Sequence, residues 1–142
     1  PAAERSFIDA LDKSSTPIPC THSNAKALCD VPRNITDDQM RALAAKDGVC
    51  QITLYNGFLT TDGKACIDDA MRHLDHAISI MGIDHVGLGT DFDGDGGVPG
   101  LANASELINF TKAMLRRRYS EDDMAKIWGG NWLRVMRTVQ NY

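Results

Sequence analysis

The stretch HVGLGTDFDG at residues 85–94 is an apolar run that stops at two carboxylates. Its valine and leucine are typical of a buried strand, whereas a carboxylate is costly to bury without a partner. A strand that ends in acids predicts a sheet whose carboxyl edge faces a functional site. Open α/β sheets and (β/α) barrels place their chemistry at that edge. The segment TPIPCT at 16–21 repeats the pattern, because His22, Ser23 and Asn24 follow it directly.

Strand-like and helical segments alternate along the chain. Apolar spacing, capping residues and glycine stops predict where each segment begins and ends. We expect strands at 17–21, 49–55 and 85–90, and helices at 3–13, 65–81 and 105–118. Further helices are expected to begin at Thr36 and at Ser120, and a last one to follow Gly129-Gly130-Asn131 and end near Val139.

This alternation predicts parallel strands joined by right-handed crossovers. Three strands are few for a complete sheet, and a (β/α)8 barrel needs about 250 residues. We therefore predict an α/β fold that is the C-terminal part of a (β/α)8 TIM-like barrel, with about three βα units plus terminal helices. The prediction assigns residues 1–142 to a single partial barrel domain.

The composition is that of a globular chain without a basic face. Of the 142 residues, 43% are hydrophobic and 24% are charged, and the net charge is −4. No nucleic-acid partner is expected, and the basic run at 116–118 is interpreted as a solvated helix end. No apolar run approaches the roughly 20 residues that span a bilayer, and no signal peptide opens the chain. We expect no membrane-spanning segment and leave the compartment open.

Three side chains near the predicted strand ends are candidates for a site. His22 could bind zinc through a neutral imidazole, or could only make hydrogen bonds in a loop. Asp91 could act as a general acid or base or as a metal ligand, or could simply form a turn. Arg33 could hold a carboxylate through two parallel hydrogen bonds, or be an ordinary surface arginine.

Two further patterns are weaker. Residues 91–96 match the D-x-D-x-D-G start of a calcium loop, but position 12 is Ala102 instead of glutamate. A calcium loop of that type also follows a helix, whereas this segment follows a predicted strand. His73 and His76 are three residues apart on one predicted helix. A core or surface pair is favoured over a metal pair, because few acids are spaced to complete a site.

The four cysteines, Cys20, Cys29, Cys50 and Cys66, include no C-x-x-C pair. Zinc-ribbon and redox sites therefore lack their spacing. Cys20 and Cys50 fall within apolar strands, so we expect both to be buried thiols.

Five blocks in register, from about residue 15 to residue 140, resemble the membrane (renal) dipeptidase family of zinc metallopeptidases. They are THSNA (21–25), PRNITD (32–37), HLDH (73–76), VGLGTDFDG (86–94) and GGNWLRV (129–135). Agreement of five blocks in order and spacing is far more specific than any single motif above. The fuller glycine-rich loop that follows the fourth block is similar to that of bacterial members.

The resemblance implies a (β/α)8 barrel with two zinc ions at its carboxyl end. It also implies hydrolysis of dipeptides, often with a D-residue at the second position. His22 corresponds to a histidine ligand of the second zinc, and Arg33 to the arginine that grips the substrate. Asp91 corresponds to the last-strand aspartate that handles a proton and positions the nucleophile. We expect a dipeptide substrate, a homo-oligomer, and a bacterial protein that is soluble or associated with the cell envelope.

The sequence departs from this family in its metal ligands. The family's first-strand His-x-Asp pair, bridging glutamate and other second-zinc histidine have no counterpart here, and no H-x-D precedes Pro17. One histidine is too few for a two-metal site. We therefore expect a piece of a longer enzyme, whose site is completed by residues missing from this chain. The alternative is a truncated, inactive relative that serves as a non-catalytic α/β binding module.

Overall fold

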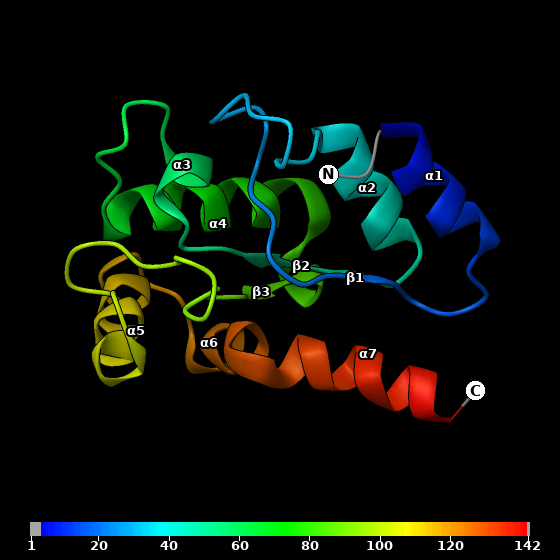
Figure 1. Cartoon of the computed structure of the whole chain (residues 1–142). Coiled ribbons are helices and arrows are strands. Elements are labelled where there is room, and N and C mark those ends of the chain that lie inside the picture. Colours follow the sequence, from blue (N-terminus) through cyan, green and yellow to red (C-terminus); the bar gives the residue numbers. More distant parts are fainter. Residues whose placement is uncertain (1–3, 142) are drawn as a thin grey trace.

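The structure is a computed structural model that describes residues 4–141, and a three-stranded parallel sheet lies at its centre (Figure 1). The strands are β1 (Pro19–Cys20), β2 (Val49–Ile52) and β3 (Val86–Leu88), in the order β1-β2-β3. The parallel pairing confirms what the alternation of strands and helices predicts. Each strand is shorter than predicted: β2 and β3 mainly lose residues at their carboxyl ends to loops, whereas β1 also lacks Pro17 and Ile18 at its amino end.

The helices form one layer on each side of the sheet (Figure 1). One layer contains α1 (Glu4–Lys13), α2 (Asp37–Ala45) and α4 (Ile67–Met81). The other contains α5 (Leu107–Arg116), α6 (Glu121–Ala125) and α7 (Asn131–Gln140). A π-helical turn at Lys126–Gly130 joins α6 to α7, and short 3-10 turns lie at Ile83–His85 and Ala104–Glu106. The predicted helices are therefore present, although the first was predicted to start at Ala3, which lies outside the described residues.

One short helix was not predicted. Residues Asn56–Leu59 form α3 directly after β2, where the Asn-Gly pair indicated only a turn. The Phe58 N–H donates to the Tyr55 carbonyl and the Thr60 N–H to the Asn56 carbonyl, which close this single turn. Local turn chemistry alone does not distinguish a tight turn from one turn of helix.

The start of α2 shows how strongly the local sequence specifies a helix end. Thr36 Oγ1 accepts a hydrogen bond from the Gln39 N–H at 3.2 Å, and Gln39 Oε1 accepts one from the Thr36 N–H at 2.8 Å. This reciprocal capping box satisfies two backbone donors that the first helical turn leaves free. Ser120 and Asp123 form the same box at α6, which begins where the sequence predicts a helix start.

The main core fills the space between the sheet and the layer that contains α2 and α4. Met40 and Leu43 of α2, Met71 and Leu74 of α4, and Ile52 of β2 are fully buried there. Burial of side chains of this size stabilises the fold by about 1.5–3 kcal/mol each. The apolar stripes of α2 and α4, spaced at three and four residues, therefore hold both helices against the sheet.

The two strand cysteines differ in burial. Cys50 is completely buried, as predicted, whereas Cys20 on the edge strand is only half-buried. Burial raises the pKa of Cys20 to about 11. Burial raises the pKa of Cys50 as well, and the neighbouring Cys20 thiol adds to the effect. Both groups are therefore thiols at neutral pH.

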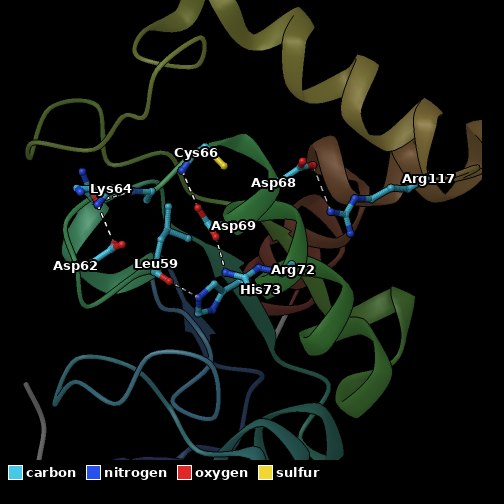
Figure 2. A network of polar contacts seen from close by, with 11 residues as sticks. Leu59, Asp62, Lys64, Cys66, Asp68, Asp69, Arg72, His73 and Arg117 are labelled. Atoms are coloured by element: carbon cyan, nitrogen blue, oxygen red, sulfur yellow. Dashed lines mark hydrogen bonds and ion pairs between the residues drawn. The ribbon is translucent and has the colours of Figure 1, made fainter.

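His73 and His76 contact different partners. His73 is 1% exposed. Its Nδ1 accepts a hydrogen bond from the Ala25 N–H at 3.0 Å. Its Nε2 donates to the Leu59 carbonyl at 3.1 Å, as Figure 2 shows. His76 Nε2 bonds to Asp37 at 2.8 Å. The structure thus supports the interpretation of this pair as structural.

Polar contacts tie α4 to its neighbours, as Figure 2 shows. Asp69 accepts a hydrogen bond from the Cys66 N–H at 2.8 Å at the start of the helix and pairs with Arg72. Arg117, at the end of α5, pairs with Asp68 at 3.3 Å and also with Asp75. Arg117 is therefore an exposed side chain at the helix end, as interpreted from the sequence, and it also bridges two helices.

None of the helices within the described range is both long and apolar enough to cross a membrane.

Candidate active site at the carboxyl edge of the sheet

Backbone and amide hydrogen bonds hold the carboxyl edge of the sheet together. The buried Asn24 side chain donates to the Thr53 carbonyl at 3.1 Å and accepts from the Thr53 N–H at 3.0 Å, so it joins the chain after β1 to the chain after β2. The Gly97 N–H donates to the Leu54 carbonyl at 2.9 Å and joins the loop after β3 to the same segment. The three loops therefore leave the sheet as one connected layer.

His22 and Arg33 meet at this edge. Arg33 Nη2 lies 2.9 Å from His22 Nε2, although the two residues belong to opposite ends of the loop between β1 and α2. Thr21 Oγ1 lies 2.8 Å from His22 Nδ1. The sequence predicts both residues as site candidates, and the structure adds their direct contact.

The contact with Arg33 determines which nitrogen of His22 carries the proton. A guanidinium can only donate hydrogen bonds, so Nε2 must accept and present its lone pair. The proton then sits on Nδ1 and is donated to Thr21 Oγ1. A neutral imidazole with an accepting Nε2 is the form of histidine that binds metal ions.

The loop that carries Arg33 is held by α3. The Asn34 side chain donates to the Cys29 carbonyl at 2.8 Å and to the Phe58 carbonyl at 2.9 Å. The Arg33 guanidinium carbon lies 5.6 Å from the centre of the Phe58 ring, within the range of a cation–π contact. Phe58 in turn packs on Tyr55 with 4.5 Å between ring centres. The charged group is exposed, but the structure around it is ordered by buried amides and an aromatic pair.

Asp91 lies three residues beyond the end of β3 and has an unusual backbone conformation. Its φ is 59°, in the left-handed region that aspartate tolerates better than most residues. Its carbonyl accepts hydrogen bonds from the Gly94 N–H at 2.9 Å and the Gly96 N–H at 2.7 Å. The chain therefore reverses at Asp91, and the turn-forming role is present.

Two glycines allow this reversal to be tight. A Cβ at Gly94 would lie 2.6 Å from Asp91 Oδ1, and a Cβ at Gly96 would lie 2.0 Å from the Thr90 carbonyl oxygen. The loop thus packs directly against a half-buried carboxylate. Asp91 lies at the same edge as His22, with β2 between their two strands.

Sequence reasoning missed the residues that support this edge. Asn24 and Asn34 make the amide contacts, and Phe58 contacts the guanidinium. A buried asparagine within a polar loop gives no pattern that distinguishes it from a solvated one. For α3, the one signal in the sequence was the aromatic pair Tyr55 and Phe58 after a strand, because their three-residue spacing is typical of a helix.

This edge of the sheet offers one side chain that can bind a metal ion, which is too few for a complete metal site. His22 presents a lone pair, but among residues 4–141 no group of three or more His, Cys, Asp or Glu side chains could hold a metal ion. A zinc site needs three or four protein ligands. These residues alone therefore supply one donor.

Comparison with known proteins identifies the family. The family model described as "Membrane dipeptidase (Peptidase family M19)" matches residues 1–142. The chain belongs to the membrane dipeptidase family. The resemblance seen in the five sequence blocks is thereby confirmed.

Relatives of this dipeptidase-family chain come from bacteria, fungi and mammals. An uncharacterized protein of the pqqA 5' region of Klebsiella pneumoniae is 39% identical over 140 residues, which are 96% of this chain and 52% of that protein. Dipeptidase tcpJ of Claviceps purpurea is 36% identical over 141 residues, which are 98% of this chain and 33% of that protein. The chain thus spans about half or less of the length of these relatives, and its bacterial origin stays a prediction.

A solved structure shows the dipeptidase fold directly. The metallo peptidase from Rhodobacter sphaeroides, crystallised with a phosphinate mimic of the dipeptide L-Ala-D-Ala, superposes with a TM-score of 0.90 at 34% identity. The match covers 95% of this chain and 40% of that chain. The predicted α/β fold of a partial barrel is confirmed, and membership of this metallopeptidase family implies a metal cofactor.

Proposed function

We propose that this chain supplies substrate-binding and proton-transfer residues to a zinc-dependent dipeptidase. The observation that carries the proposal is the contact of His22 Nε2 with Arg33 Nη2 at the carboxyl edge of the parallel sheet. It brings a neutral metal donor and a carboxylate-binding group within 2.9 Å of each other. A dipeptide has a free carboxylate very near its scissile bond, so a dipeptidase needs these two groups close together.

His22 is the proposed zinc ligand of this chain, through Nε2, whose lone pair the Arg33 guanidinium must release when the metal binds. Since residues 4–141 hold no group of three possible ligands, the other ligands of the one or two zinc ions must come from elsewhere in the assembled enzyme. The greater length of the relatives supports this assignment. A bound zinc ion supplies Lewis acidity and lowers the pKa of water.

Arg33 is the proposed binding group for the substrate carboxylate. Its planar guanidinium can donate two parallel hydrogen bonds to the two carboxylate oxygens. Phe58 beneath the guanidinium and the Asn34 amide behind the loop hold it in place without neutralising its charge. Its full charge therefore remains available to the ligand.

Asp91 is the proposed proton carrier. Its carboxylate can accept a proton from the attacking water and then donate it to the nitrogen of the leaving amino acid. The left-handed backbone at Asp91 and the glycines at 94 and 96 fix the direction of this side chain. Rigid placement is what proton transfer over a hydrogen-bond distance requires.

Hydrolysis of a small dipeptide panel by the complete protein tests the proposal. The panel contains Gly-D-Ala and L-Ala-D-Ala, the second because the Rhodobacter sphaeroides protein was crystallised with a mimic of that dipeptide. We expect turnover that needs zinc and that a chelator abolishes. Absence of hydrolysis of every dipeptide by the zinc-loaded complete protein would overturn the proposal and favour a binding module.

Single substitutions assign the roles. Asp91→Asn is expected to lower kcat by roughly 100-fold or more, which is the usual contribution of general acid–base catalysis. Arg33→Lys should mainly raise KM, by roughly tenfold or more, because one charge-assisted hydrogen bond is lost. His22→Ala should lower zinc content, measured by metal analysis. Asp93→Asn and Arg41→Lys are matched controls on exposed side chains and should leave kinetics and zinc content unchanged.

A further inference from the structure

A pocket adjoins the contact between His22 and Arg33. Its volume is about 200 Å³, and residues of α1, of the loop between β1 and α2, and of the first turn of α2 line it. Arg33 is one of these residues, and so is Ser23, which directly follows His22 in the chain. The pocket is therefore next to the groups to which we assign metal and carboxylate binding.

Lys26 gives this pocket a second positive charge. Its backbone N–H donates to the Ile35 carbonyl at 2.9 Å, which holds Lys26 beside the segment that leads from Arg33 to α2. Its ammonium group has an acidic neighbour, Asp30, at 3.7 Å, and that side chain is 84% exposed. Exposed pairs of this kind contribute little, so the ammonium group remains available to a ligand. Within the described part of the chain, no Asp or Glu lines the pocket.

Gln39 adds an uncharged hydrogen-bond donor to the lining. Its side chain is 7% exposed and lines the pocket. Its Oε1 accepts a hydrogen bond from the Thr36 N–H at 2.8 Å, which fixes the end of the amide that carries the oxygen. No acceptor within residues 4–141 takes a hydrogen bond from the NH2 group at the other end. This donor, like the hydroxyl of Ser23, is therefore available to a ligand.

These groups select the chemistry of the ligand. An ammonium, a guanidinium and an amide NH2 group all donate hydrogen bonds, so together they stabilise an anion and disfavour a cation. Phe7 and Ile35 also line the pocket, and such apolar walls suit methylene groups. The ligand group that fits is therefore a carboxylate on a short aliphatic arm, which is the side chain of aspartate or glutamate.

We propose that this pocket binds the acidic side chain of the C-terminal residue of a dipeptide, and that Lys26 determines this specificity. The inference rests on the proposed function, in which Arg33 binds the α-carboxylate of that same residue. The side chain is attached to the carbon that bears this carboxylate, so it lies close to Arg33 and can enter the adjoining pocket. The substrate class is dipeptides that end in glutamate or aspartate.

Hydrolysis of Gly-D-Glu and Gly-D-Gln by the zinc-loaded complete protein tests the proposal, because these two dipeptides differ in charge and hardly in shape. We expect kcat/KM to be roughly tenfold or more higher for Gly-D-Glu, the usual effect of one hydrogen bond to a charged group. Lys26→Met should bring the two values close together, and Lys26→Glu should favour Gly-D-Gln. Lys46→Met, an exposed lysine at the end of α2, is the matched control and should keep the original ratio.

Equal kcat/KM values for the two dipeptides would overturn this inference and leave the proposed function intact. So would a preference for Gly-D-Glu that persists in Lys26→Met, or a preference that appears only for an acidic first residue, as in Asp-D-Ala against Asn-D-Ala.

Failure of the proposed function gives a different result, which is no hydrolysis of any dipeptide. Titration calorimetry of Gly-D-Glu and Gly-D-Gln then decides the inference by binding alone. Tighter binding of Gly-D-Glu that Lys26→Met removes would support the pocket assignment, and equal binding would overturn it. The Lys26 side chain is 40% exposed, so we expect Lys26→Met to fold, which circular dichroism checks.

Discussion

His73 is a buried imidazole with both nitrogens used by uncharged backbone groups. Ala25 donates to Nδ1, so that nitrogen carries no proton, and Nε2 donates to Leu59. Burial lowers the pKa of His73 below its ordinary value, and the nearby Arg72 and His76 act in the same direction. The residue is therefore neutral in the fold, where a proton on Nδ1 would break the bond from Ala25.

The first prediction concerns pH. The unfolded chain binds a proton at His73 with an ordinary pKa of about 6.5, whereas the folded chain binds it only at lower pH. The His73 contribution to stability is therefore complete above pH 6.5. It is lost as pH falls from 6.5 toward the folded pKa, by at most about 1.4 kcal/mol per pH unit. Urea unfolding between pH 7.5 and pH 5 measures this slope.

Two variants isolate the contribution of this one histidine. His73→Gln can still donate to the Leu59 carbonyl but does not titrate, so the slope should become smaller. Ser79→Ala, on an exposed position of the same helix that does not titrate, should keep the original slope. Equal slopes in all three proteins would contradict the prediction.

Thiol reactivity provides the second prediction. Cys66 is exposed, whereas Cys29 and Cys50 are buried and Cys20 is half-buried with a pKa of about 11. At pH 8 only about 0.1% of the Cys20 side chains are thiolate, the reactive form. We expect one fast-reacting thiol with Ellman's reagent in the folded protein and four after denaturation. The fast phase should vanish in Cys66→Ser and remain in Cys29→Ser; any other outcome contradicts the burial pattern.

At the scale of elements, side-chain amides connect pieces that are distant in the sequence. Asn24 joins the loops after β1 and β2, and Asn34 joins the Arg33 loop to α3. Asn131, at the start of α7, donates to the carbonyls of Ile83 at 2.7 Å and Val86 at 2.8 Å. Asn131 of the Gly-Gly-Asn block thus attaches the last helix to the beginning of β3. The sequence alone indicated only that this block separates two helices.

The third prediction follows from this attachment. Asn131 is 4% exposed, so Asn131→Ala leaves two carbonyl groups without their donor in a buried place. The free energy of unfolding should fall by about 1–3 kcal/mol, measured by chemical denaturation. Asn141→Ala, an exposed asparagine at the end of the same helix, should change it by less than about 0.5 kcal/mol. Equal effects of the two substitutions would show that the Asn131 contacts contribute nothing.

At the scale of the whole molecule, the sheet has two unpaired edges. Within the described residues β1 and β3 each pair with β2 alone. An apolar groove of about 450 Å³ lies between α7 and the segment before β1, with Trp132, Met136 and Val139 among its lining residues. Unpaired edges and exposed apolar surface favour association with another chain.

The fourth prediction is that the chain associates with itself. Sedimentation equilibrium should give a mass above 15.5 kDa that rises with protein concentration. Val139→Lys places a charge in the groove and should weaken association, whereas Thr138→Lys on the neighbouring exposed position should not. A constant mass of 15.5 kDa at all concentrations would contradict the prediction.

Local pattern by itself determined the order and type of the main elements, the capped helix starts, and the three candidates His22, Arg33 and Asp91. These depend on interactions over a few residues: apolar spacing, caps, and polar groups at strand ends. Only the tertiary structure decided that His22 faces Arg33, that His73 lies in the core, that Arg117 bridges two helices, and that Cys20 lies beside Cys50. The partners in these contacts are 11 to 49 residues apart. Strand register and helix packing bring them together, and neither is encoded in any one stretch of the chain.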